Sequence, residues 1–268
     1  MRRLLVSLAF VTLAGCATTA EEKVVSAQTA DNSVERAAQA LRRGDEALAS
    51  NQFEEAARNY DFVRVTFPYL AAATEAELRL ADVDFASDMW AAARERYNTF
   101  IKLHPTSPKV DYAAYRAALS WFREIPGDFF LLPSSISKDQ GSTQGAAREL
   151  KAFIKNYPES QYVPEAQKAL DATIDKLAQH ELLVATFYRK EERWKAVALR
   201  LETLLEKYPE SKRRPEALLS LSEAYAKLER PDDAREALER LVASDPDSEQ
   251  AAQARERLAQ SKAPADKG

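Results

Sequence analysis

The sequence predicts an all-α protein, a solenoid of about five helix-turn-helix repeats, and three observations support this prediction. An aromatic or polar residue followed by proline ends a helical pattern five times, at Pro68, Pro105, Pro158, Pro209 and Pro246. The first two prolines lie 37 residues apart, as do the last two, which fits a repeat of two helices. Small and large apolar residues alternate at helical spacing between the prolines, as close-packed antiparallel helices require. Only 6 glycines occur in 268 residues, too few for the tight turns of an all-β fold.

The N-terminus predicts export and lipid attachment. Residues 1–15 form a predicted signal peptide, in which Arg2 and Arg3 precede a ten-residue apolar stretch. That stretch is too short to span a bilayer as a helix, which needs about 20 residues. The tetrapeptide LAGC, which ends at Cys16, resembles the lipobox of bacterial lipoproteins and implies that lipid is attached to the Cys16 sulfur. Cys16 is the chain's single cysteine, and Ala17 after it favours the outer membrane over the inner.

The rest of the chain divides into four predicted parts. Residues 16–32, the lipidated N-terminus, are expected to be a flexible tether that spans about 20–24 Å as a coil. Residues 33–160 form an N-terminal module of three repeats, with an insertion at about 123–143. Residues 161–260 contain a long connecting helix and a C-terminal repeat module, and residues 261–268 form a disordered tail.

Individual positions fit this plan. In the first repeat Gly44 is expected where two helices cross, with Tyr60 on the second helix. An apolar ridge continues from Val163 to Lys190, which predicts one helix about 40 Å long that joins the two modules. The insertion contains an apolar run at 125–133, which either packs against the solenoid or forms a contact surface.

Motifs for catalysis, metals and nucleic acid are missing from the sequence. His104 and His180 have no cluster of partners at metal-ligand spacing, and the sequence has no glycine-rich phosphate loop. The formal net charge of -4 becomes -6 when Arg2 and Arg3 leave with the signal peptide, which disfavours a nucleic acid partner. We therefore expect a binding protein and not an enzyme, with no metal and no cofactor beyond the covalent lipid on Cys16.

Three stretches of the repeats resemble a known family. Residues 103–115 (LHPTSPKVDYAAY) resemble the segment LNPxHPxxDYxxY, and residues 157–170 match the motif YPxSxYxxxAxxxL. Residues 177–209, which include Trp194, resemble the family's long-helix region and the helix after it. Together with the lipobox, they resemble the BamD family, the tetratricopeptide-repeat lipoproteins of the outer-membrane β-barrel assembly machine. The resemblance covers roughly residues 30–245. It implies a non-catalytic scaffold and substrate receptor, lipid-anchored at the periplasmic face of the outer membrane.

The resemblance also implies partners and site residues. Arg200 falls on a family arginine that contacts the barrel-forming subunit through its periplasmic domain, and Trp194 lies in the same matched helix. Unfolded outer-membrane proteins are the implied substrates, and the aromatic candidates for binding them are Tyr69, Phe85, Tyr112 and Tyr115. After the paired phenylalanines at 129 and 130, the chain departs from the charged segment of the family. Contacts with accessory lipoproteins are therefore in doubt.

Two other functions remain open on the sequence alone. A tetratricopeptide lipoprotein could act as a pilotin-like assembly factor for a secretin or a pilus. A cell-envelope enzyme, for example one acting on peptidoglycan, could carry the repeats as an accessory. Nearly the whole mature chain is assigned to repeats, which leaves no room for a catalytic domain. The proteins that copurify with the chain would distinguish these alternatives.

Overall fold

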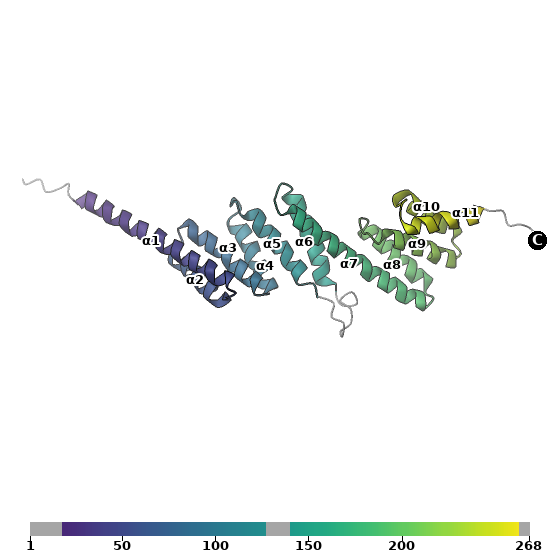
Figure 1. Cartoon of the computed structure of the whole chain (residues 1–268), viewed down its shortest axis with the longest axis horizontal. Helices are drawn as coiled ribbons and strands as arrows, with labels where there is room; N and C mark the ends of the chain where they lie inside the picture. Colours follow the sequence, from purple (N-terminus) through teal and green to yellow (C-terminus); the bar gives the residue numbers. More distant parts are fainter. Residues whose placement is uncertain (1–17, 127–139, 263–268) are drawn as a thin grey trace, which may run out of the picture. The chain divides into compact units, whose positions relative to one another are not determined.

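The computed structural model describes residues 18–126 and 140–262, with side chains described for 32–126 and 140–260. All regular elements in these ranges are helices, which confirms the predicted all-α repeat fold. The long helix predicted at 163–190 is present with those bounds. The helices follow in the order α1 (Thr18–Ala49), α2 (Phe53–Thr66), α3 (Ala71–Ala86), α4 (Trp90–Leu103), α5 (Val110–Arg123), α6 (Gly141–Asn156), α7 (Val163–Lys190), α8 (Trp194–Lys207), α9 (Arg214–Lys227), α10 (Pro231–Ser244) and α11 (Glu249–Lys262) (Figure 1).

The chain forms two units, one that ends at Ser87 and one that begins at Asp88. The sequence placed the module boundary between residues 160 and 161 instead. The structure differs because an apolar core continues across that point: Phe153 of α6 packs in one cluster with Ala166 and Leu170 of α7. Helices α4 to α11 therefore belong to a single unit.

The first unit is built around α2, which packs against both α1 and α3. Tyr60 of α2 is fully buried at the crossing with α1. A Cβ at Gly44 of α1 would lie 2.5 Å from the Tyr60 ring, so only glycine lets the two helices approach this closely. The helix crossing predicted at Gly44 is thus confirmed.

The aromatic- or polar-proline pairs end five helices, as predicted. The residue before each proline is the C-cap, with φ between -137° and -127° and ψ between 51° and 58° at Phe67, His104, Tyr157, Tyr208 and Asp245. Proline causes this shared geometry because its ring disfavours the helical conformation in the preceding residue. Each cap N–H still donates to the carbonyl four residues earlier.

In four of these turns a serine stands two residues after the proline and precedes the next helix. We call this pattern the Pro-x-Ser turn. The serine N–H donates to the cap carbonyl at 3.0 or 3.1 Å. Its hydroxyl accepts an N–H from the start of the following helix, at 3.1–3.3 Å. The four residues are Ser107, Ser160, Ser211 and Ser248. The hydroxyl satisfies a backbone donor that has no partner within the helix.

A second kind of turn joins the two helices of a repeat. Four of these turns have three residues, and the middle one adopts a left-handed φ of 54–61°: Asn51, Asp88, Glu192 and Glu229. After Glu229, the N–H of Arg230 donates to the carbonyl of Tyr225 at 3.0 Å, and Gln52 and Arg193 form the same bond with the residues five before them. This bond closes the preceding helix in the manner of a Schellman cap.

The expected tether has a different conformation from the one predicted. Residues 18–32 are helical and form the first part of α1. They contain neither proline nor glycine, and several are good helix formers, so the helix that begins the first repeat extends backwards through them. The signal peptide, Cys16, residues 127–139 of the insertion and residues 263–268 of the tail lie outside the described residues.

Candidate binding surfaces

The second unit contains a continuous row of aromatic rings, here called the aromatic ladder. Tyr115 stacks on Tyr162 with ring centroids 5.0 Å apart and planes 4° apart. Tyr112 contacts the same ring of Tyr162 at 5.6 Å. The row continues from these three rings to Tyr97 in one direction and to Phe153 and Tyr157 in the other. The candidates Tyr112 and Tyr115 are therefore brought together, with Tyr162 between them.

The ladder has a buried base and an accessible edge. Tyr97 is fully buried and Phe153 is nearly so, whereas Tyr112, Tyr115 and Tyr162 are half-buried. Burial raises the pKa of Tyr115, and the charge of a nearby glutamate, Glu165, raises it further. The Tyr115 hydroxyl therefore stays neutral at physiological pH and can donate a hydrogen bond beside an apolar ring face.

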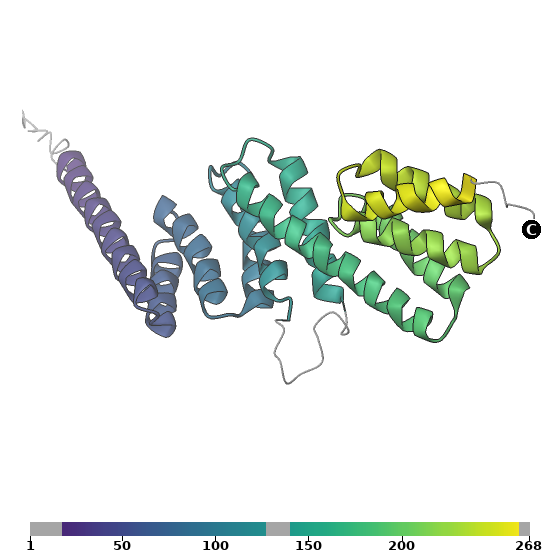
Figure 2. The ribbon, with the colours of Figure 1, turned by 45° about the vertical axis from the view of Figure 1, so that its right-hand side comes forward.

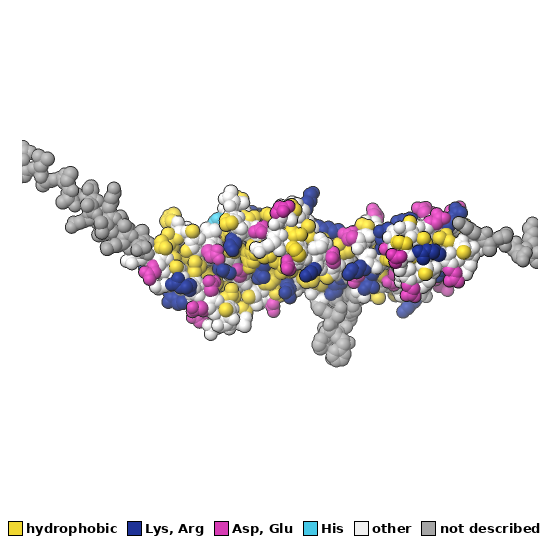
Figure 3. All heavy atoms as spheres, turned by 45° about the horizontal axis from the view of Figure 1, so that its top comes forward, with side chains coloured by type: hydrophobic (Ala, Val, Ile, Leu, Met, Phe, Trp, Pro, Cys, Tyr) yellow, Lys and Arg dark blue, Asp and Glu magenta, His cyan; other side chains and the backbone are white. Residues whose placement is uncertain are grey.

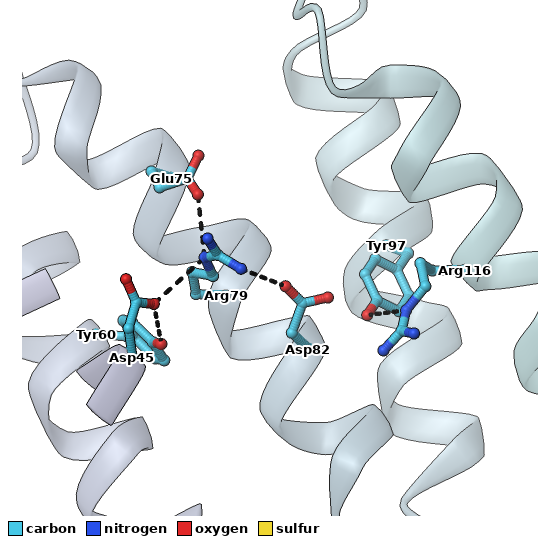
Figure 4. A network of polar contacts seen from close by, with 7 residues as sticks. All are labelled: Asp45, Tyr60, Glu75, Arg79, Asp82, Tyr97 and Arg116. Carbon is cyan, nitrogen blue, oxygen red and sulfur yellow. Dashed lines mark hydrogen bonds and ion pairs between the residues drawn. The ribbon is translucent and has the colours of Figure 1, made fainter. Parts of the chain in front are cut away.

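Polar contacts hold the ladder in place. Arg116 Nε donates to the Tyr97 hydroxyl at 3.2 Å (Figure 4), and its guanidinium lies 5.7 Å from the Tyr112 ring centroid. Ser160 Oγ donates to Asp111 Oδ2 at 2.8 Å, which ties the α6–α7 turn to the start of α5. A cation therefore lies beside the accessible aromatic edge, in the arrangement that binds both rings and carboxylates.

The two other aromatic candidates lie in the first unit. Tyr69, in the turn between α2 and α3, is 99% exposed and free to contact a ligand. Phe85 of α3 is only 7% exposed, which argues against the expected role in binding substrate, because little of its ring is accessible. An apolar residue on a helix can face either way, and its residue type alone does not reveal which.

The first unit also contains a network of charged side chains centred on Arg79 (Figure 4). Arg79 Nε lies 3.6 Å from Asp45 and 3.1 Å from Glu75, and Nη1 lies 3.5 Å from Asp82. Burial opposes ionisation, but these three carboxylates raise the pKa of Arg79. Tyr60 donates to Asp45 at 2.7 Å. The network links α1, α2 and α3, and we assign it a structural role.

Arg200 and Trp194 lie on α8, and both take part in contacts between helices. Arg200 Nη1 lies 3.4 Å from Glu181 Oε2 of α7. The Glu181 side chain is only 12% exposed, whereas that of Arg200 is 40% exposed. Trp194 is half-buried against the core, and Lys227 Nζ lies 5.8 Å from its ring centroid. The guanidinium of Arg200 is thus accessible beside Leu199, which is 61% exposed.

A groove of about 650 Å³ follows in the last repeats. Apolar Ala234 and Leu238 line it together with charged side chains of both signs: Lys227, Arg235 and Arg257, and Glu223 and Glu229.

The described residues contain no group of three potential metal ligands. No described helix is long and apolar enough to cross a membrane. Acidic and basic side chains alternate over the face shown in Figure 3, with no large area of one sign.

Two residues of these surfaces were not among the site residues predicted from the sequence. Tyr162 is the second aromatic residue of the quoted motif YPxSxY, and its place in that motif could have pointed to it. Glu181, the partner of Arg200, lies 19 residues away on another helix, and no local pattern indicates this pairing.

Comparisons with known proteins point to one family. A family model described as YfiO, outer membrane lipoprotein, matches residues 34–241. The outer membrane protein assembly factor BamD of Caulobacter vibrioides is 26% identical over 180 residues, which cover 67% of this chain. That of Pasteurella multocida is 27% identical over 184 residues, also 67% of this chain and 70% of its own length. That of Neisseria meningitidis serogroup B is 26% identical over 224 residues, 82% of this chain and 83% of its own length.

The match spans little more than half, 56%, of the Caulobacter protein. Among solved structures, a complex of the TPR2AB domain of yeast Sti1 with an Hsp90 peptide resembles the chain at 12% sequence identity and a TM-score of 0.41. It covers 84% of each chain.

Proposed function

Because this chain belongs to the YfiO family of outer membrane lipoproteins, we propose that it takes part in the assembly of β-barrel proteins in the outer membrane. Its relatives are named outer membrane protein assembly factors. In this proposal it is a non-catalytic scaffold and substrate receptor at the periplasmic face. The observation that carries the proposal is the family match over residues 34–241, which includes both the aromatic ladder and the Arg200 region of α8.

The aromatic ladder supports the receptor role. Its accessible edge offers half-buried rings and the guanidinium of Arg116, and fixed rings bind a partner ring at little entropic cost. An unfolded outer-membrane protein presents extended segments with aromatic residues and a terminal carboxylate. The ladder would take the ring and Arg116 the carboxylate.

The exposed face of α8 around Arg200 supports the scaffold role. Arg200 keeps its guanidinium partly in solvent while Glu181 fixes its position, and Leu199 adds an apolar contact beside it. A pre-positioned arginine next to an exposed apolar residue is typical of the residues that dominate protein interfaces. We assign this surface to a periplasmic domain of the barrel-forming subunit.

Lipid on Cys16 would anchor the chain. Attachment of several acyl chains to one residue binds a protein stably to a membrane, whereas a single chain does not. Replacement of Cys16 by alanine is expected to release the folded protein from the membrane fraction.

The proposal is tested by purification of the tagged full chain from detergent-solubilised membranes, with mass spectrometry of the bound proteins. We expect the barrel-forming subunit to be recovered. Recovery of a secretin without that subunit would replace the proposal with a pilotin-like function. Peptidoglycan hydrolysis by the pure chain, lost on a point substitution, would contradict the non-catalytic role.

The receptor role has its own test. A peptide that ends in phenylalanine should bind Tyr115→Ala about ten-fold more weakly than the wild type. The matched control is the same peptide with alanine at its end, which should bind both proteins equally weakly. Equal loss of both peptides on substitution would mean that Tyr115 supports the fold and does not contact the ligand ring.

A further inference from the structure

Helix α7 exposes an apolar stripe along its C-terminal half. His180, Leu183, Val184 and Phe187 recur at intervals of three or four residues, so they share one face of the helix. Leu183 is 44% exposed and Phe187 is 59% exposed. A groove of about 370 Å³ runs beside them, lined by these four residues together with Thr186, Tyr188 and Lys190. Such a surface is costly to leave in water, which indicates that something covers it.

The stripe is exposed because α7 is longer than its neighbour. Helix α6 has 16 residues and α7 has 28, and the two pack together after a short turn, so they run in opposite directions. The first residues of α6 therefore lie beside the middle of α7. Beyond that point α7 continues without α6, as Figures 1 and 2 show. Gln140, where the described chain resumes before α6, therefore lies at this place.

At the other end of the segment 127–139, the described chain is attached to α7 itself. Lys176 Nζ donates to the backbone carbonyl of Pro126, the last described residue before the segment, at 3.1 Å. Lys176 lies one helical turn before His180 and on the same face. Both ends of the segment therefore lie where the stripe begins.

The segment is long enough to reach the whole stripe. From Lys176 to Phe187 the helix rises about 16 Å, at 1.5 Å per residue. Residues 129–132 (FFLL) follow Pro126 by three to six positions, which correspond to roughly 10–20 Å of extended chain. The apolar run and the apolar stripe thus match in both position and length.

We propose that residues 129–132 dock on the α7 stripe of the same chain. Phe129, Phe130, Leu131 and Leu132 supply the apolar surface, and the groove beside Leu183 and Phe187 receives it. In the sequence Asp128 precedes the run, and Lys176 precedes the stripe, so docking in this direction would bring opposite charges together. The inference is independent of the function proposed above.

Limited trypsin digestion of the full chain tests this docking. Lys138 is the single trypsin site within residues 127–139, and it is eight positions from Phe130, so substitutions at Phe130 do not alter its recognition. Phe187→Asp should speed cleavage after Lys138 on the order of ten-fold, because it removes the ring that the docked run would cover and adds a charge to the groove. The matched control is Val65→Asp on α2, which is 63% exposed but lies off the stripe, and which should leave the rate unchanged.

A double-mutant cycle gives the decisive result. Phe130→Ser should speed cleavage as Phe187→Asp does, and the two together should do no more than one alone, since each removes the same contact. Multiplying effects, or equal cleavage of Phe187→Asp and the wild type, would refute the docking. So would a wild-type rate that falls with rising protein concentration, because a second copy would then be the occupant. Circular dichroism of each variant checks that the helices remain folded.

Discussion

Arg200→Gln separates a contribution to the fold from a contribution to binding, provided that Glu181 is taken into account. The two side chains join α7 to α8 with Nη1 and Oε2 3.4 Å apart. Removal of the guanidinium leaves a carboxylate whose side chain is 12% exposed without its cation. Loss of partner binding in this variant alone would therefore be ambiguous.

The size of the effect on folding follows from burial. A buried polar group left without a partner costs about 1–3 kcal/mol, and a fully buried charge costs more. Because Arg200 is 40% exposed and water can reach the gap that it leaves, we expect the lower part of that range, about 1–2 kcal/mol. For a domain of this size, 1 kcal/mol lowers the melting temperature by about 2–4 °C, so Arg200→Gln should lose roughly 2–8 °C.

The control is the double variant Glu181→Gln/Arg200→Gln, measured by thermal unfolding and by copurification of the partner. It removes both charges, so its melting temperature should return to within about 2 °C of the wild type. If Arg200 contacts the partner, the double variant stays deficient in binding despite its restored stability. A double variant as unstable as Arg200→Gln would show that the pair does not stabilise α7 against α8, and restored binding would remove Arg200 from the interface.

Two further predictions concern stability. Glu229→Gly should raise the free energy of unfolding, measured in urea, by about 0.5–1 kcal/mol, since glycine adopts the left-handed φ of 57° without strain. Asn51→Gly should change the free energy of unfolding little, because asparagine tolerates that region, and equal effects of the two substitutions would contradict this account. Burial, followed by the hydrogen bond to Glu202, raises the pKa of Tyr225 from 10.0 to about 12, so this tyrosine's stabilising contribution is complete below pH 10 and is lost as the pH rises through about 12. The melting temperature of Tyr225→Phe should therefore fall less steeply than that of the wild type as the pH rises over that range. Parallel curves of melting temperature against pH would disprove the linkage.

The parts of the fold that were predicted from sequence depend on local chemistry. Proline disfavours the helical conformation in the residue before it, which is why the helix ends at Phe67 and Tyr208 were predictable. The apolar ridge of α7 similarly defined its bounds. The helical state of residues 18–32 was missed because small polar residues suggested a coil, whereas an adjoining helix extends through such a segment at little cost.

The candidate sites were harder to predict because they depend on contacts between distant residues. The motif that contains Tyr162 was recognised, but its stacking on Tyr115 joins the start of α7 to α5. Two other features, the pairing of Arg200 with Glu181 and the burial of Phe85, likewise depend on which face each helix turns toward its neighbours. Residue type and spacing constrain that rotation only loosely.

The Pro-x-Ser turn makes the repeats exchangeable units. The backbone hydrogen bonds that end one helix and start the next at this turn lie within about ten consecutive residues, as does the bond to the serine hydroxyl. The stretch from Pro209 to Asp245 begins just after one such cap and ends on the next. A tandem duplication of that stretch would carry its own junction with it, and the array could be lengthened without redesign of either end. Gain or loss of whole repeats is then a small genetic step for this architecture.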